Sequence, residues 1–394
     1  MPDLSDEDSG DDSDSGGDSD SGGDSGSDRA SGGDGGDSGD DHGHGAHGRV
    51  PTRRERWEDF KKSPFLPATV LVFILAAAAG LFAGSYTYTM ANPTPHRIPT
   101  AVVGAANASH GGEFLAGMER ALNASLQLHP YPNLPAALAG VDQQKVFAVL
   151  DVRAGDRVSL VVSGASGASV AQVLAETAPK VGAALGVPVT VTDARPLQKG
   201  DPRGLAIFYI SLAAVIIGFV GAIQLSVHAR ALNPWERIAY TVAYAMAGAF
   251  VIAAVVDWWL GALDLPFAES WAILALTMFT SGMVFTMFNT LFGRWAMIPT
   301  WGLMVLLGNP SSGGAVSWPL LPSVLGRIGR WLPPGASVNA QHTAVYFGGY
   351  QHVFPFLVLA AWALLSCGVF WFWRHRHPGG RTSEPAHAAP QGET

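Results

Sequence analysis

Two short stretches rich in glycine and serine contain the residues best suited to hold a ligand. The first, VSGASGAS at residues 162–169, follows a run typical of a β-strand and precedes a run typical of a helix. A loop of this kind can hold an anion at the N-terminus of the helix that follows it. The favoured interpretation is a plain turn from strand to helix, in which Ser169 caps the helix.

The second stretch interrupts an apolar run that begins at residue 295. Backbone groups cannot stay unpaired in lipid, so a break at membrane depth must be sheltered by protein or by water. The residues after the break predict a short amphipathic helix that ends before Pro333 and Pro334 and cannot span a bilayer. We therefore expect residues 308–335 to form a re-entrant or interfacial segment. The break itself consists of Asn309, Pro310, Ser311, Ser312, Gly313 and Gly314.

Signatures of the common catalytic and metal sites are absent from the sequence. It contains no Walker-type phosphate loop, no HExxH or GxSxG motif and no pair of cysteines. The single cysteine, Cys367, lies in an apolar run and is expected to behave as a small apolar side chain. His42, His44 and His47 lie in a glycine-rich tail that gives a metal no ordered site. We therefore expect no catalytic residue, no metal and no cofactor, and an enzyme is the least favoured class.

Six apolar runs, each close to the roughly 20 residues that span a bilayer, determine the expected fold class. The runs contain no Asp, Glu, Lys or Arg, which is unusual for buried helices of a soluble protein. The sequence therefore predicts an α-helical polytopic membrane protein with one span, a large insertion and five further spans. The runs cover residues 67–88, 205–227, 238–256, 271–292, 295–315 and 353–373.

Several polar but uncharged side chains lie inside these runs. In a helix bundle such groups most often hydrogen-bond a neighbouring helix, and lining a pathway is the less favoured alternative. The runs hold no pair of carboxylates, so a proton-coupled transporter that uses intramembrane carboxylates has little support. The polar residues are Gln224, Thr277, Thr280, Ser281, Thr286 and Asn289.

Charges that flank the runs predict the orientation. Five basic residues between 53 and 62 precede the first run, and the loop 228–237 carries Arg230 and Arg237. The loop 257–270 instead carries three acidic residues and no base. Because basic residues favour the cytoplasmic side, we expect a plasma-membrane protein with both termini in the cytoplasm and an uncleaved first span. Arg327 and Arg330 then lie on the opposite side, which the rule tolerates in a longer connection.

Composition divides the chain into five parts. Residues 1–52 form an acidic Asp/Ser/Gly tail that we expect to be disordered. Its first 48 residues hold 15 acidic residues and one arginine, whereas the rest of the chain carries a net charge of +6. Next come a membrane-surface helix with the first span at 53–90 and an extracytoplasmic α/β domain at 91–204. A five-helix membrane domain at 205–375 and a cytoplasmic tail at 376–394 complete the chain.

The insertion at 91–204 alternates between strand and helix patterns. Strands are predicted at 98–105, 145–152, 157–165 and 187–194, and helices at 111–125 and 169–186. This order is typical of a mixed α/β domain. Nine basic against eight acidic residues give no sign of a nucleic-acid partner.

The order of these parts resembles that of the ABC-2 type transporter permeases, and most of all their YhgE/Pip-like branch among actinobacterial membrane proteins. The resemblance covers residues 53–375 and is carried by RIPTAVVGAAN, KVFAVLDVRAGDRVSLVVSGASG, FNTLFGRWAMIPTWGLMVLLGNPSSGGAVSWPLLP and LPPGASVNAQHTAVYFGG. It implies a permease half that forms a homodimer in the lipid bilayer and works with a separate ABC ATPase. In such permeases the surface helix and the first cytoplasmic loop face the ATPase. The residues expected at that contact are Trp57, Arg230, Trp235 and Arg237.

Two functions follow from this interpretation. The first is an export permease subunit for an amphiphile, a drug or an envelope component. Its outer gate would be the segment 308–335, and Gln224, Asn289 and the break at 309–314 would line its pathway. The alternative is a non-transporting membrane scaffold or receptor whose external domain binds a cell-envelope or phage partner. Loss of Arg230, Trp235 and Arg237 would disable the permease and leave the scaffold intact.

Overall fold

The computed structural model of the chain describes residues 52–54, 57, 63, 65–91, 95–104, 109–153 and 157–377. The chain divides into two compact units, residues 1–66 and 67–394, and the elements described below belong to the second except for the first two residues of α2. The predicted acidic tail up to residue 51, its three histidines, most of the predicted surface helix and the tail after residue 377 lie outside the described residues.

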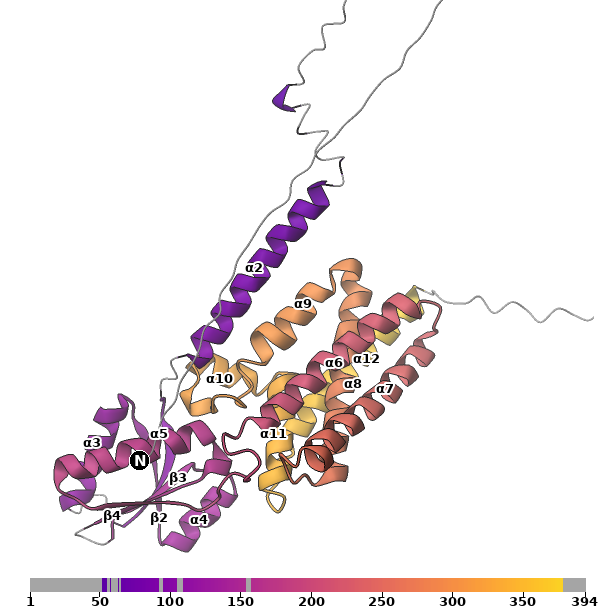
Figure 1. The fold of residues 1–394 in the computed structure, drawn as a ribbon. Helices are drawn as coiled ribbons and strands as arrows, with labels where there is room; N and C mark the ends of the chain where they lie inside the picture. Colours follow the sequence, from indigo (N-terminus) through magenta and orange to yellow (C-terminus); the bar gives the residue numbers. More distant parts are fainter. Residues whose placement is uncertain are drawn as a thin grey trace, which may run out of the picture. The chain divides into compact units, whose positions relative to one another are not determined.

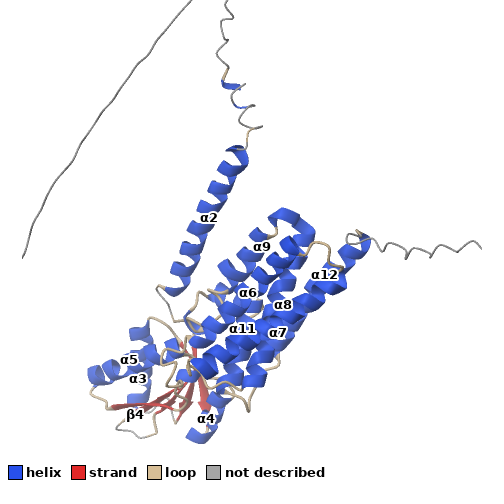
Figure 2. Ribbon diagram, turned by 45° about the vertical axis from the view of Figure 1, so that its right-hand side comes forward, coloured by secondary structure: helices blue, strands red, loops and turns tan. Residues whose placement is uncertain are grey.

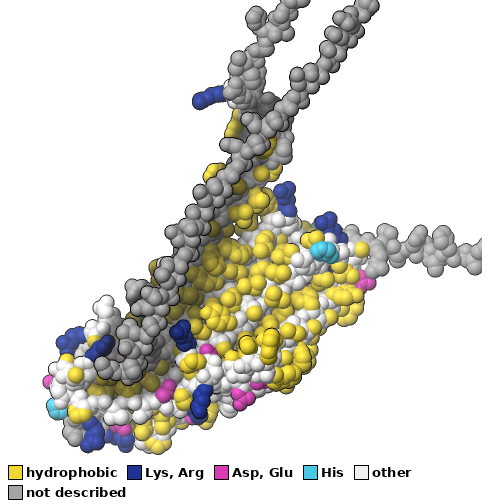
Figure 3. Space-filling model, in the orientation of Figure 1, with side chains coloured by type: hydrophobic (Ala, Val, Ile, Leu, Met, Phe, Trp, Pro, Cys, Tyr) yellow, Lys and Arg dark blue, Asp and Glu magenta, His cyan; other side chains and the backbone are white. Residues whose placement is uncertain are grey.

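Five helices in the described part of the chain are long and apolar enough to cross a membrane. They are the helices of a multi-pass membrane protein by length and composition. Apolar side chains cover the visible face of the bundle, and charged side chains gather toward its ends (Figure 3). In Figure 1 these helices are α2 (Phe65–Met90), α6 (Ala206–His228), α7 (Pro234–Ala254, extended by a π-helical turn, Val255–Trp259), α8 (Phe267–Phe292) and α12 (Phe354–Arg376).

Helix α8 lies at the centre of the bundle and packs against α6, α7, α12 and α11 (Pro333–Tyr346). Small residues and short hydrogen bonds allow this close packing. The Ser281 hydroxyl donates to the Val215 carbonyl of α6 at 2.6 Å, and the Tyr244 hydroxyl of α7 donates to the Gly218 carbonyl at 2.6 Å. Thr277 and Thr286 donate to carbonyls of their own helix, as polar residues in a packed bundle do.

The fifth predicted span, 295–315, is not a continuous helix. A 3-10 turn (Gly293–Trp295) leads into α9 (Met297–Trp301) and the π-helix η4 (Gly302–Gly308), where the helix ends. The apolar helix Met297–Gly308 is therefore shorter than the other five. After the break come the 3-10 turn η5 (Trp318–Leu320) and α10 (Ser323–Gly329), which corresponds to the predicted short amphipathic helix.

The insertion folds into a five-stranded mixed sheet with the strand order β2-β1-β3-β4-β5. All neighbouring strands are parallel except β3 and β4, which pair antiparallel with Ala148 opposite Val162. The strands are β1 (Ile98–Val103), β2 (Leu126–Tyr131), β3 (Ala148–Asp151), β4 (Val158–Val162) and β5 (Val189–Asp193).

Helices cover both faces of this sheet (Figure 2). Side chains alternate along a strand, so Ile98 and Val102 of β1 pack toward α3 and α5, whereas Ala101 and Val103 pack toward α4. The sequence patterns predicted α3 and α5 but missed both α4 and β2. The three helices are α3 (Ser109–Leu122), α4 (Leu134–Asp142) and α5 (Ala168–Leu185).

The core on the α3/α5 side of the sheet is completed by side chains from the broken segment. Val316, Leu320 and Leu321 are buried in the same cluster as Ile98 and Phe114. The backbone is joined there as well, because the His96 amide donates to the Pro319 carbonyl at 2.6 Å. The insertion and the broken segment therefore share a hydrophobic core.

Candidate functional site

The end of the broken helix η4 leaves four backbone carbonyls without a partner in the helix, and side chains supply the missing donors. Two donors come from α2, more than 200 residues earlier in the chain. The Ser85 hydroxyl donates to the Leu306 carbonyl at 2.6 Å, and the Tyr86 hydroxyl donates to the Val305 carbonyl at 3.5 Å.

The other two carbonyls are satisfied by the break itself. The Ser311 hydroxyl lies 2.6 Å from the Leu307 carbonyl oxygen and 3.3 Å from that of Gly308. The indole N–H of Trp318 donates in turn to the Ser311 carbonyl at 3.4 Å. The interruption at residue 309 is thus sheltered by protein, as its polar residues predicted.

Glycines bring the turns of the broken segment into close contact. A Cβ atom on Gly308 would lie 2.6 Å from Pro334 Cγ, and one on Gly329 would clash with the Ser311 backbone. Gly313 has a φ of +83°, which other residues rarely adopt. The break at 308–313, the end of α10 and the first turn of α11 therefore pack with their backbones nearly touching.

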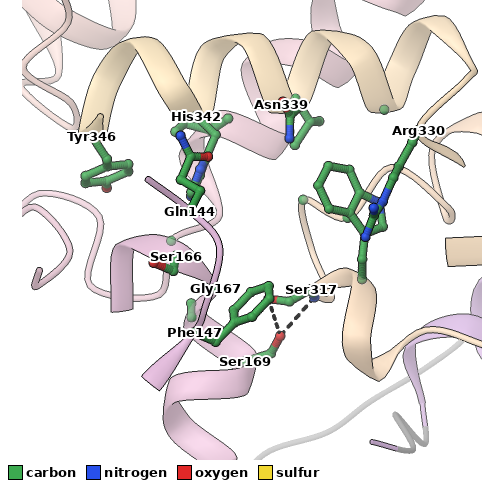
Figure 4. A pocket seen from close by; sticks show the side chains of 18 of the residues that line it. Gln144, Phe147, Ser166, Gly167, Ser169, Ser317, Arg330, Asn339, His342 and Tyr346 are labelled. Carbon is green, nitrogen blue, oxygen red and sulfur yellow. Dashed lines mark hydrogen bonds between the residues drawn. The ribbon is translucent and has the colours of Figure 1, made fainter. Parts of the chain in front are cut away.

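A cavity of about 410 Å³ lies where this segment meets the sheet domain and α11 (Figure 4). Its wall comes from four stretches of chain, 144–147, 164–169, 313–318 and 335–346, together with single residues such as Arg330 and Phe354. Glycine and alanine make up much of that wall and leave the space open. Its lining includes Lys145 and Arg330 but no aspartate or glutamate.

Arg330 is the cationic side chain labelled in the view of the cavity (Figure 4). Its guanidinium carbon lies 4.8 Å from the centroid of the Trp318 indole, within the range of a cation–π contact. Partial burial lowers the pKa of the Arg330 guanidinium below its ordinary value, but the group stays protonated at any physiological pH. The structure therefore places a fixed positive charge at the cavity.

His342 on α11 contributes a neutral polar group. Burial lowers the pKa of its imidazole to about 4, so the ring is uncharged at pH 7. The ring lies close to the side chains of Tyr346 and Phe347, with centroid distances of 5.4 and 5.8 Å. Asn339, His342 and Tyr346 are drawn on one helix facing the cavity (Figure 4). These polar groups sit among apolar walls, which is typical of small-molecule sites.

The loop VSGASGAS forms part of the cavity wall, but the serine that caps a helical turn is not the one predicted. Ser163, not Ser169, caps a short turn by accepting the Ser166 amide at 3.1 Å. The prediction that Ser169 caps α5 is therefore wrong, because Gly167 occupies the cap position. The Gly164 amide is not free to bind an anion, because it already donates to both carboxylate oxygens of Asp193 at 3.2 Å.

Ser169 instead joins the sheet domain to the broken segment. Its hydroxyl accepts the Ser317 amide at 2.9 Å and lies 2.9 Å from the Ser317 hydroxyl (Figure 4). Gly167 makes this approach possible, because a Cβ atom there would lie 2.6 Å from the Ser317 hydroxyl oxygen.

The predicted pathway residues do not gather at one place. Gly313 and Gly314 line the cavity, whereas Asn309, Pro310, Ser311 and Ser312 are buried outside it. Gln224 is exposed on α6, 17 residues beyond the cavity-lining Ile207, or roughly 25 Å along the helix axis. Asn289 is similarly remote, near the C-terminal end of α8.

Of the residues expected to face an ATPase, Arg230 lies in the connection between α6 and α7, and Trp235 and Arg237 lie in the first turn of α7. Arg230 and Trp235 are exposed there, and 68% of the surface of Trp235 is accessible. Arg237 is half-buried and donates to the Ala229 carbonyl at 3.3 Å, which fixes the end of α6. Trp57 is exposed in the other unit of the chain.

Sequence reasoning missed α11 and the residues it brings to the cavity. The sequence that forms this helix contains the polar run SVNAQHT between two apolar regions. This run has no helical periodicity by which the helix could be predicted. Within the described residues, no group of three or more His, Cys, Asp or Glu side chains is placed to hold a metal ion. Comparison with protein-family models, curated proteins and solved structures found no match.

Proposed function

We propose that this chain is the membrane subunit of an ABC-2 type exporter that moves an amphiphile, a drug or an envelope component with the help of a separate ATPase. The observation that carries the proposal is the cavity beside residues 313–318, which follow the broken helix, with the sheet domain on its other side. A helix interrupted beside a partly polar cavity is how membrane proteins place irregular backbone at a substrate site.

The topology that fits this function has six crossings. The five long helices would span the bilayer, and α9 with η4 would enter it as the fifth crossing and stop at Asn309. Both termini would be cytoplasmic and the sheet domain extracytoplasmic, so the cavity would open on the outer side. A homodimer would complete the pathway, as the resemblance to ABC-2 permeases implies.

The loop between α6 and α7 is suited to transmit force from an ATPase. The Arg237–Ala229 bond and the bond from the Asn233 amide to the Glu236 carboxylate, 2.9 Å long, hold it in shape. Arg230 in this loop and Trp235 in the first turn of α7 are both exposed. Arg237 has a structural role within the chain, so Arg230 and Trp235 are the better probes of a partner.

The proposal is tested by purifying the tagged chain from its native membrane in mild detergent and identifying co-purifying proteins by mass spectrometry. We expect an ATPase with a P-loop, and we expect Arg230→Ala with Trp235→Ala to release it. Arg327→Ala, an exposed arginine on α10, is the matched control and should retain the partner. A chain that emerges without an ATPase would overturn the exporter and favour the scaffold alternative.

A further inference from the structure

The charge of the cavity selects the kind of ligand it can hold. Lys145 and Arg330 belong to its lining, and the lining contains no carboxylate to neutralise them. His342 is neutral at pH 7, so it neither adds to nor opposes this charge. Lys145 and Arg330 are both exposed, so solvent screens their charge, and a lining with cations and no carboxylate still favours an anionic group over a cationic one.

Arg330 is oriented for such a contact before any ligand arrives. The Trp318 indole supports one face of its guanidinium, and Trp318 is itself held by its bond to the Ser311 carbonyl and by contact with Gly313. Among the described residues, the Arg330 guanidinium makes no ion pair and no hydrogen bond. Its donors are therefore available for a phosphate or carboxylate, which they match in a two-point geometry.

The same cavity continues into an exposed apolar surface. Phe354 lines the cavity and contacts Trp331 edge to face, with ring centroids 4.9 Å apart. Trp331 is 63% exposed, and beside it α10 exposes Val324 and Ile328. An apolar chain can thus leave the cavity past Phe354 and lie against α10, where the membrane boundary is expected.

We propose that this cavity binds an anionic amphiphile, whose phosphate or carboxylate is held by Arg330, while Lys145 adds positive charge to the same lining and the apolar chain lies along Phe354, Trp331 and α10. The inference rests on the proposed function in treating this molecule as the cargo of the exporter. The binding itself needs no ATPase, so it can be tested separately.

The test is a calorimetric titration of the full chain, purified without a partner in a neutral maltoside detergent. The probes are water-soluble dihexanoyl phosphatidic acid, dihexanoyl phosphatidylcholine and inorganic phosphate. We expect phosphatidic acid to bind most tightly, because only it combines the exposed anion with apolar chains. Arg330→Gln should weaken that binding about tenfold or more, as the loss of a charge-assisted contact does.

Two further variants keep the result interpretable. Arg327→Gln removes an exposed arginine three residues away that does not line the cavity, and it should leave the affinity unchanged. Lys145→Gln removes a charge from an exposed lining residue and should weaken binding by a smaller factor, even if Arg330→Gln proves unstable.

Several outcomes would overturn the inference. Equal affinity for phosphatidylcholine would show that charge is not recognised, and equal affinity for inorganic phosphate would show an anion site without an amphiphile. An equal loss in Arg327→Gln would place the ligand elsewhere. If a chain that recruits no ATPase still binds phosphatidic acid tightly and through Arg330, the proposed ligand is supported and the exporter function is refuted. The two proposals can therefore fail separately.

Discussion

Ser85 and Leu306 lie 221 residues apart in the chain, and the hydroxyl of the first donates to the carbonyl of the second at 2.6 Å. This bond joins the first apolar helix to the last turn of the broken one. It gives a partner to a carbonyl that the end of η4 leaves unpaired in apolar surroundings. The interruption at Asn309 is therefore stabilised by a helix that sequence alone does not connect with it.

Replacing Ser85 with alanine should destabilise the protein by about 0.5–1.5 kcal/mol, because the Leu306 carbonyl loses its donor. Thermal unfolding in detergent, followed by intrinsic fluorescence, measures the change. Ser226→Ala is the matched control, since that hydroxyl bonds to the Ile223 carbonyl of its own helix. Equal losses in the two variants would contradict the proposed role of Ser85.

The contact between Ser169 and Ser317 can be captured covalently. Their hydroxyl oxygens lie 2.9 Å apart, so cysteines at both positions should form a disulfide on mild oxidation. Cys367→Ser provides the background, because Cys367 is the one native thiol. Crosslinking is read as a mobility shift that a reducing agent reverses.

The control pair for that experiment is Ser169→Cys with Ser323→Cys, which moves the second thiol to α10. We expect little crosslinking there. If both pairs crosslink at similar rates, the sheet domain moves freely against the broken segment and the cavity has no fixed wall.

Asp201 stabilises the start of α6, where the chain passes from the sheet domain into the bundle. Its carboxylate accepts the Leu205 amide at 3.0 Å and the Ala206 amide at 2.9 Å, and its side chain is buried. Asp201→Ala should cost about 1–2 kcal/mol of stability, as the loss of a capping side chain does. Asp201→Asn keeps one acceptor oxygen and should recover much of this in unfolding measurements. A fully tolerated Asp201→Ala would exclude the capping role.

Stability should fall in mild acid because of His342. The pKa of its ring is about 4 in the folded protein and near 6.5 in the unfolded chain, so only the unfolded chain binds a proton between these values. The free energy of unfolding therefore keeps its neutral-pH value above pH 6.5. It falls by about 2–3 kcal/mol as the pH drops from 6.5 toward 4. His342→Gln should flatten this part of a melting-temperature profile measured from pH 7.5 to 4.5. An unchanged slope would assign the acid sensitivity to other groups.

The membrane helices and most of the sheet domain were predictable because their patterns are strong. Long uncharged runs marked the five spanning helices, and β1, β3, β4 and β5 fall inside the predicted strands. β2 was missed because it is an edge strand that contains Pro130 and buries only its first residue. α4 was missed because its nine residues are too few to show a helical period.

The cavity was harder to predict than the elements around it. Helix α11 is buried on almost every side, so it has no polar face to reveal a helical period. Pro333 and Pro334 favour the end of a segment in the sequence, but proline also begins helices, as it does here. The cavity also joins residues near 145, 167, 315 and 340, and nothing in a single sequence brings those four stretches together.

An exporter subunit purified from its native membrane should carry the ATP hydrolysis of its partner ATPase, and this activity is the decisive measurement. We expect vanadate-sensitive hydrolysis that co-purifies with the chain, persists in Arg327→Ala and is lost when Arg230 and Trp235 are both replaced by alanine. A chain that retains its fold by thermal unfolding and yet elutes without hydrolysis in any of these preparations would contradict the exporter function.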